Sequence, residues 1–227
     1  MRRAGGRAWG GAALAAALMA VVHPAVGASA APDVACEQAS QAATAAAHLP
    51  PGLLTAIGRV ESGRYSATLG RVAPWPWAVD FAGAGVLFTT QGAALRAIRA
   101  AWAGGQRNID VGCFQVNLGA HPGAFPDLRS ALEPGTNARF AAGFLAGLRA
   151  RLGSWPAAAA AYHSETAALA RPYLLAVMRN WAGGATAAAP DRTWVVVTRV
   201  RGPRVIVPGG AMPVAADGMR IVGPGAG

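Results

Sequence analysis

Apolar residues recur at helical spacing over much of this chain. In the stretch PGLLTAIGRVESG, residues 51–63, Leu54, Ile57 and Val60 follow one another at intervals of three residues, which places them on one face of a helix. Comparable patterns, bounded by proline, glycine or capping residues, predict helices at 34–47, 52–62, 91–103, 136–152, 155–162 and 172–181. We therefore expect a mainly α protein.

One carboxylate is expected on the inward face of the second helix. Glu61 follows Ile57 by four residues and Leu54 by seven, so the helical period carries it to the apolar side. Pro51 suits the first turn, and Gly63 is expected to end the helix with a positive φ. Burial and the negative end of the helix dipole both favour a protonated Glu61, the form that a general acid needs. The alternative is a glutamate at the helix edge with its carboxyl group in water.

The segment after this helix has a different pattern. Prolines exclude a helix at the start of PWPWAVDFAGAGVLFTT, residues 74–90, and the alternation around Gly83 predicts a short hairpin. Together with the helices, this hairpin indicates an α+β fold. Trp75 and Trp77 either stack on sugar rings in a groove or cover the core.

Amide side chains alternate with apolar ones in NIDVGCFQVNLGAHP, residues 108–122. Gln115 and Asn117 suit recognition of the N-acetyl and hydroxyl groups of a sugar, and loop capping explains them equally well. Farther along, Tyr162 ends a helical run and Tyr173 follows in RPYLLAV. A buried tyrosine hydroxyl needs a hydrogen-bond partner, and a carboxylic acid is a good one.

The N-terminal 30 residues are interpreted as an export signal. Three arginines precede an apolar run at 8–22, and Ala28-Ser29-Ala30 offers small residues for cleavage. An uncleaved membrane anchor is the alternative, although the run is short for a spanning helix. Residues 31–182 are expected to form one compact domain. The segment 183–227 is rich in Gly, Ala and Pro and is predicted to be a poorly ordered extension that forms a strand or two or offers a strand to a partner.

Charge and histidine spacing narrow the classes of ligand. Removing residues 1–30 leaves 17 of the 20 basic residues and all 10 acidic ones, a formal charge of +7. Such a protein is attracted to anionic polymers, but no nucleic-acid motif is present, so nucleic acid is not an expected partner. His48, His121 and His163 lack paired spacing, so neither a metal nor another cofactor is expected.

Two cysteines, Cys36 and Cys113, occur in the chain. In an exported protein they favour one disulfide that ties the N-terminal helix to the central segment. The alternative is a thiol–imidazole pair of Cys113 with His121 or His163, as in secreted cysteine peptidases and amidases.

Three motifs in order resemble one family. AIGRVESGR, DVGCFQVN and AYHSE with a later tyrosine resemble the ES, G-L-M-Q-[IL] and A-Y-N-x-G motifs of the lytic transglycosylase (SLT) domain, which has the goose-type lysozyme fold. The resemblance covers roughly residues 36–181, and is greatest to a periplasmic subgroup with a PWPW hairpin. It departs from the pattern at His163 and Glu165, which replace the Asn and Gly of the third motif, and at Cys113.

The resemblance implies a lysozyme-like domain that cleaves peptidoglycan in the periplasm. Glu61 would be the single acid and base acting between N-acetylmuramic acid and N-acetylglucosamine, and the product would be a 1,6-anhydromuramyl end. The remaining implied site residues are expected to bind glycan or orient Glu61: Ser62, Trp77, Gln115, Asn117, Tyr162, His163 and Tyr173. Tyr162 is expected to hydrogen-bond to Glu61. A monomer is expected, and a secretion, conjugation or flagellar apparatus is a candidate partner.

Two alternatives remain within this interpretation. A hydrolytic muramidase needs a second carboxylate, for which Asp80, Asp110 and Glu165 are the candidates, although each also suits a turn or the surface. A catalytically silent peptidoglycan-binding scaffold of a secretion or motility apparatus is the other.

Overall fold

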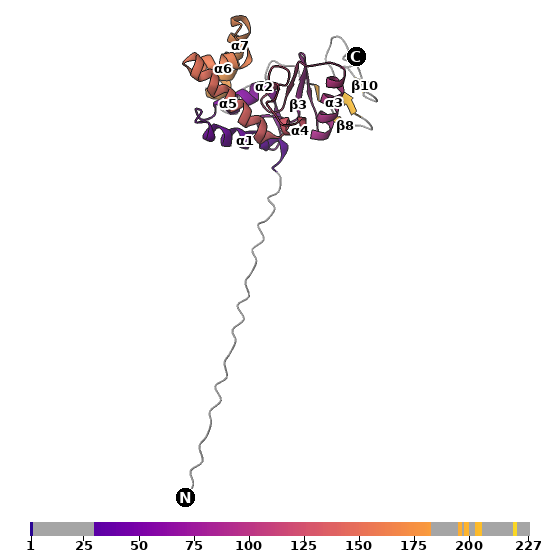
Figure 1. Ribbon diagram of the computed structural model, residues 1–227, viewed down its shortest axis with the longest axis vertical. Helices are drawn as coiled ribbons and strands as arrows, with labels where there is room; N and C mark the ends of the chain where they lie inside the picture. Colours follow the sequence, from indigo (N-terminus) through magenta and orange to yellow (C-terminus); the bar gives the residue numbers. More distant parts are fainter. Residues whose placement is uncertain (2–29, 183–194, 197, 200–202, 206–219, 222–227) are drawn as a thin grey trace.

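Seven α-helices and a small sheet make up most of the chain that the structure describes. The computed structural model describes Met1, residues 30–182 and four short strands at 195–196, 198–199, 203–205 and 220–221 (Figure 1). The predicted export signal therefore lies almost entirely outside the described residues. The helices are α1 (Pro32–Ala46), α2 (Leu53–Ser62), α3 (Gln91–Ala103), α4 (Leu128–Ala131), α5 (Pro134–Leu152), α6 (Trp155–His163) and α7 (Ala167–Ala182). The mainly α, α+β class is confirmed.

The observed helix bounds follow the sequence pattern closely, except at α7. Five of the six predicted helices begin and end within two residues of the observed bounds. The sequence predicts Pro172 in the first turn of the last helix, but α7 begins at Ala167 and contains the proline. It begins earlier because the Thr166 carbonyl accepts from the N–H groups of Leu169 and Ala170. The four-residue α4 has no counterpart among the predicted helices.

The central sheet is built around the predicted hairpin. Its antiparallel part has the order β6 (Val116–Asn117), β5 (Ile109–Val111), β3 (Ala78–Phe81) and β4 (Ala84–Leu87). The β3–β4 turn places Ala82 at φ 54° and Gly83 at φ 98°, and positive φ at both central positions gives the twist that a tight hairpin needs. The hairpin predicted around Gly83 is confirmed.

Four short strands occur among the described residues of the C-terminal region, where the sequence predicts one or two. β7 (Val195–Val196) pairs in parallel with β4, and β8 (Thr198–Arg199), β9 (Pro203–Val205) and β10 (Arg220–Ile221) form a separate small sheet. The rest of 183–227 lies outside the described residues. Within the described part of the chain, no helix is long and apolar enough to cross a bilayer.

Gly63 ends α2 in a way that the sequence does not predict. Its φ is −62° and its ψ is 132°, an extended conformation instead of the expected positive φ. Glycine is required here by close packing, because a Cβ would lie 2.1 Å from the carbonyl oxygen of Arg59. The positive φ occurs at the other end of the helix, at the N-cap Gly52. From Gly63 the chain enters β1 (Gly63–Ser66), which pairs antiparallel with β2 (Arg71–Pro74).

Two hydrophobic cores support these elements. The first joins α1, α2, α5, α6 and α7 and contains Leu54 and Leu145, both fully buried. The second packs the sheet against α3 and α4 and contains Val79 and Ile98, also fully buried. Figure 1 shows α5, α6 and α7 at one end of the described fold, and β3, α3 and α4 toward the other. A site between the two cores would therefore take residues from the helical core and from the sheet.

The predicted disulfide is present and joins α1 to the turn between β5 and β6. Cys36 and Cys113 are bonded, with their Cα atoms 5.8 Å apart and 77 residues of separation. Both side chains are completely buried. Closing a loop of this length restricts the unfolded chain and contributes roughly 4 kcal/mol in the chain-entropy model. The bond also fits an oxidising, extracytoplasmic compartment.

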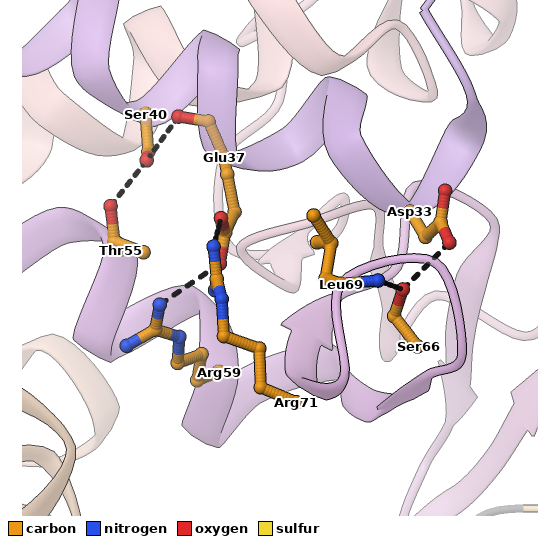
Figure 2. A network of polar contacts seen from close by, with 8 residues as sticks. All are labelled: Asp33, Glu37, Ser40, Thr55, Arg59, Ser66, Leu69 and Arg71. Carbon is orange, nitrogen blue, oxygen red and sulfur yellow. Dashed lines mark hydrogen bonds and ion pairs between the residues drawn. The ribbon is translucent and has the colours of Figure 1, made fainter. Parts of the chain in front are cut away.

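A buried ion-pair network joins α1, α2 and β2 on one side of the helical core (Figure 2). Glu37 of α1 accepts from Arg59 at 2.9 Å and from two nitrogens of Arg71. On the same helix, Ser40 shares a hydrogen bond with Thr55 of α2. Burial alone would raise the pKa of Glu37, but the hydrogen bonds and charges of the two arginines outweigh it and hold the pKa below its ordinary value. Glu37 is therefore charged at neutral pH.

Replacing Glu37 with Gln is expected to lower the free energy of unfolding at neutral pH by about 3 kcal/mol, because breaking a buried ion pair leaves its partners uncompensated. A lowered folded-state pKa stabilises the protein above the unfolded pKa, and this contribution is lost as the pH falls through the folded value. The difference between parent and variant should therefore shrink below the ordinary glutamate value of 4.5. Urea unfolding followed by circular dichroism at several pH values measures it.

The matched control is Glu165→Gln, which removes the same charge from an exposed pair. The Arg151 and Glu165 side chains are 52% and 66% exposed, so this change should have little effect at any pH. Equal losses of unfolding free energy for the two variants would show that the buried network stabilises the fold no more than an exposed ion pair does.

Candidate active site

A cavity of about 360 Å³ lies between the helical core and the sheet. Residues from the end of α2, from β5 and β6 with the loop that follows, from α5 and from the end of α6 line it. They are Glu61, Asn108, Asp110, Gln115, Val116, Asn117, Ala120, His121, Phe140, Phe144, Tyr162 and His163. Five of the eight site residues expected from the sequence are among them, and Ser62, Trp77 and Tyr173 are not.

Glu61 lies on the inward face of α2, as the helical period predicts. It is 3% exposed, and Leu54 and Ile57 on the same face are fully buried. The alternative of a carboxyl group in open water at the helix edge is therefore wrong. α2 begins at Leu53, just after Pro51, and Glu61 occupies its last turn. There the carboxyl group meets the negative end of the helix dipole.

Ser62 has a different place from the one expected. It is fully buried, and its hydroxyl group donates to the Cys113 carbonyl at 2.7 Å and accepts from the Trp75 N–H at 3.0 Å. Because it lies outside the cavity lining with its hydroxyl used in this way, the expectation that it holds substrate is corrected. Ser62 instead fastens the end of α2 to two neighbouring loops.

Gln115 lines the cavity and carries one side-chain acceptor without a protein partner. Its backbone takes a positive φ of 47°, and its side-chain nitrogen donates to the carbonyl groups of Ala78 and Gly112 at 3.1 and 3.0 Å. These bonds fix the amide plane. The side-chain oxygen is buried and has no hydrogen-bond partner. An unsatisfied buried acceptor is costly, so this atom indicates a donor on a bound ligand.

Asn117 and Asp110 face each other across β5 and β6. They are directly paired in the strand register, and the Asn117 amide nitrogen donates to Asp110 at 2.7 Å and to Asn108 at 2.6 Å. The amide oxygen of Asn117 accepts from the Ala120 N–H. All four residues line the cavity, so this wall is a connected polar surface that includes a second carboxylate.

Tyr162 brings a phenol into the same space. Its hydroxyl group donates to the Phe114 carbonyl at 2.9 Å. Burial, together with the negative charges of Glu61 and Asp110, raises its pKa well above the ordinary value. Tyr162 is therefore neutral at neutral pH. Since its proton is directed to Phe114, a hydrogen bond with Glu61 would use the phenol oxygen as acceptor from a protonated acid, and that contact stays a prediction.

His163 and Tyr173 act together. His163 lines the cavity, and its ring stacks on Tyr173 with a centroid distance of 4.7 Å and an interplanar angle of 11°. Tyr173 is itself 7% exposed within the helical core. Tyr173 therefore supports the wall from behind by orienting the imidazole.

The remaining sequence candidates lie elsewhere. Trp75 is 5% exposed and donates to the Phe88 carbonyl, and Trp77 packs edge-on against it at 5.2 Å. Both tryptophans therefore cover the core, and Trp77 is outside the cavity lining. Asp80 accepts from the Gly83 N–H and closes the hairpin turn, while Glu165 is an exposed partner of Arg151. Among the three candidate second carboxylates, Asp110 is in the cavity.

Several cavity-lining residues were not indicated by the sequence pattern. Phe140 and Phe144, four residues apart on α5, line the cavity, and His121 packs edge-on against both rings. Burial lowers the pKa of His121. The spacing of the two phenylalanines was a signal that could have shown a shared face, but it does not distinguish a groove from a core.

Asn137 is another residue that the sequence analysis missed. It lies in α5, is fully buried, and its amide oxygen accepts from the Phe114 N–H at 2.9 Å. Its amide nitrogen donates to the carbonyl groups of Val111 and Ala131 at 3.0 Å each. A Cβ on Gly112, where φ is 81°, would lie 2.6 Å from that nitrogen. Asn137 therefore holds the turn that positions Gln115.

The disulfide decides one alternative. Because Cys113 is bonded to Cys36, it has no thiolate with which to act as a nucleophile, and the thiol–imidazole hypothesis is wrong. Within the residues that the structure describes, no group of His, Cys, Asp and Glu side chains is arranged to hold a metal ion.

Comparisons with protein-family models, with curated proteins and with solved structures find no match to this chain in any of the three sets. The membership in a lytic transglycosylase family that the motifs imply therefore stays a prediction. What bears on function is the chemistry of the cavity.

Replacing Asn137 with Ala is expected to lower the free energy of unfolding by about 3 kcal/mol or more, because it strands an N–H and two carbonyl groups in the interior. The control on the same helix is Gly147→Ala, where an added Cβ meets open space and helix propensity predicts slight stabilisation. Guanidinium unfolding of both variants measures the difference. A cost at Asn137 no larger than the effect at Gly147 would contradict the role given to the amide.

Proposed function

We propose that this protein is a peptidoglycan lytic transglycosylase of the periplasm, with Glu61 as its single acid and base. The observation that carries the proposal is that Glu61, a 3%-exposed residue at the end of α2, lines a cavity walled by amides and aromatic rings. A general acid must hold its proton near neutral pH, and burial is the usual physical means. Amide side chains that form hydrogen bonds, together with aromatic side chains that offer apolar surface, suit the binding of an N-acetylated sugar.

The proposed reaction needs no second protein carboxylate. Glu61 donates its proton to the glycosidic oxygen between N-acetylmuramic acid and N-acetylglucosamine as the bond to C1 breaks. The carboxylate that results then takes the proton of the muramyl C6 hydroxyl group, whose oxygen attacks C1. A 1,6-anhydro ring forms, the proton is returned to Glu61, and no water is consumed. A buried acid that is regenerated within the cycle suits these steps.

The other lining residues provide recognition in this proposal. The side-chain oxygen of Gln115, which has no protein partner, accepts from an acetamido N–H or a sugar hydroxyl. Asn117 and Asp110, on β6 and β5, accept hydrogen bonds from sugar hydroxyl groups. Phe140 and Phe144 present ring surface to the apolar face of a pyranose. The excess of basic over acidic residues attracts the anionic wall polymer.

One observation favours a second candidate, a hydrolytic muramidase. Asp110 lines the same cavity as Glu61, and a hydrolytic glycosidase of the two-carboxylate type uses a second carboxylate to activate water or to attack the sugar. In that mechanism Asp110 is essential. In the lyase mechanism it is a binding and electrostatic residue.

Mass spectrometry of the fragments released from purified peptidoglycan distinguishes the candidates. We expect anhydromuramyl ends from the parent protein, and a loss of about 100-fold or more in rate for Glu61→Gln, because the amide keeps the shape of the side chain but cannot deliver a proton. Full activity in Glu61→Gln would end the assignment. Asp110→Asn should keep measurable anhydro product if the enzyme is a lyase.

The matched control is Glu165→Gln, which removes an exposed carboxylate outside the cavity and should leave the rate unchanged. Ends that carry an added water, and that disappear in Asp110→Asn, would establish the muramidase instead. Glycan binding without fragments from the parent protein would favour the silent scaffold.

A further inference from the structure

A second and larger cavity lies on the other side of α2. Its volume is about 770 Å³, and its lining comes from α1, α2, β2 and the end of α7. Arg59 in this lining is two residues from Glu61, which is about 200° around the helix. The cavity is therefore separate from the candidate active site, and the proposed reaction does not use it.

Charge in this cavity is not balanced. Glu37, Arg59 and Arg71 all line it, and one carboxylate is bonded by two guanidinium groups, which leaves a formal charge of +1. The neighbouring carboxylate, Asp33, is bonded to Ser66 (Figure 2) and does not line the cavity. Each arginine joins a different element to α1, and the surplus charge remains after both are bonded to Glu37.

One donor in the network is also unused. The Arg59 side chain is 11% exposed, and its Nε–H is buried without a hydrogen-bond partner. Figure 2 shows that one terminal nitrogen of Arg59 is turned to Glu37 and that the other points away from it. A buried unsatisfied donor on a cation favours an additional anion.

The rest of the lining suits a peptide more than a simple ion. Gln41, Thr44 and Asn180 offer neutral side chains that can hydrogen-bond to peptide groups, and Leu49 and Trp181 offer apolar surface. Arginine forks match the two oxygens of a carboxylate. A ligand that fills the cavity would therefore carry an anionic end, an amide and an apolar side chain.

We propose that this cavity binds the terminal carboxylate of a peptide, with Arg59 and Arg71 on the carboxylate and with Leu49 and Trp181 on the adjacent apolar side chain. The carboxylate of the bound peptide neutralises the charge of +1 that remains after Glu37 pairs with the two arginines. This binding depends on neither Glu61 nor glycan cleavage, so its failure leaves the proposed enzyme untouched.

The smallest probe with all three features is N-acetyl-leucine, and N-acetyl-leucinamide is its neutral counterpart. In the full mature chain labelled with ¹⁵N, the Arg59 Nε–H and the Trp181 indole N–H should show saturable NMR shifts with the carboxylate. N-acetyl-leucinamide should bind at least about tenfold more weakly, because a charge-assisted hydrogen bond is lost. Equal shifts with both compounds, or none at Arg59, would overturn the proposal.

Variants test the site without relying on one substitution. Arg71→Gln should weaken binding of N-acetyl-leucine about tenfold, and Arg151→Gln, the same charge change at an exposed residue outside the cavity, should not. Gln41→Glu places a negative charge at an exposed lining position without touching the ion pairs, and should also weaken binding. Circular dichroism checks that each variant is folded. Equal losses for Arg71→Gln and Arg151→Gln, or full affinity in Gln41→Glu, would contradict the site.

Discussion

The fastening of one short turn, Gly112–Gln115, is the constraint on which the rest of the candidate site depends. The disulfide holds Cys113 to α1, and the Ser62 hydroxyl group bonds to the carbonyl of that same cysteine. Asn137 and Tyr162 bond to the N–H and the carbonyl of the next residue. Four separate helices therefore hold two consecutive residues, Cys113 and Phe114. The turn joins β5 to β6, so these contacts also set the distance between the sheet and the helical core.

Features that depend on local spacing could be predicted from the sequence. The inward position of Glu61 follows from its offsets to Leu54 and Ile57, and the hairpin follows from the turn chemistry at Gly83. The helix bounds were found because proline, glycine and capping residues act within a few positions. The disulfide was inferred from composition and compartment, with no knowledge of its surroundings.

Features that depend on contacts between distant segments could not be predicted. Asn137 is an ordinary polar residue near the start of a helix until the β5–β6 turn packs against it, 23 residues away from Phe114, whose N–H donates to its amide oxygen. Ser62 stands next to the catalytic candidate, yet the helical period turns it to a different neighbour from Glu61. A positive φ was predicted for Gly63 from the general preference of helix ends, whereas the constraint in the structure is the nearby Arg59 carbonyl group. These three cases share this origin, because spacing defines a face and not what covers it.

The presence of Asp110 beside Glu61 does not by itself make the site hydrolytic. Asn117 donates a hydrogen bond to Asp110, which fixes that side chain in the cavity wall. A carboxylate in such a position can stabilise positive charge that develops at the sugar C1 without moving a proton. Activation of water requires in addition that water occupy the far face of the sugar, where the proposed lyase places the C6 hydroxyl group. The two mechanisms therefore differ in which oxygen is brought to C1, and that is decided by the fit of the glycan against Gln115 and the α5 rings more than by the number of carboxylates.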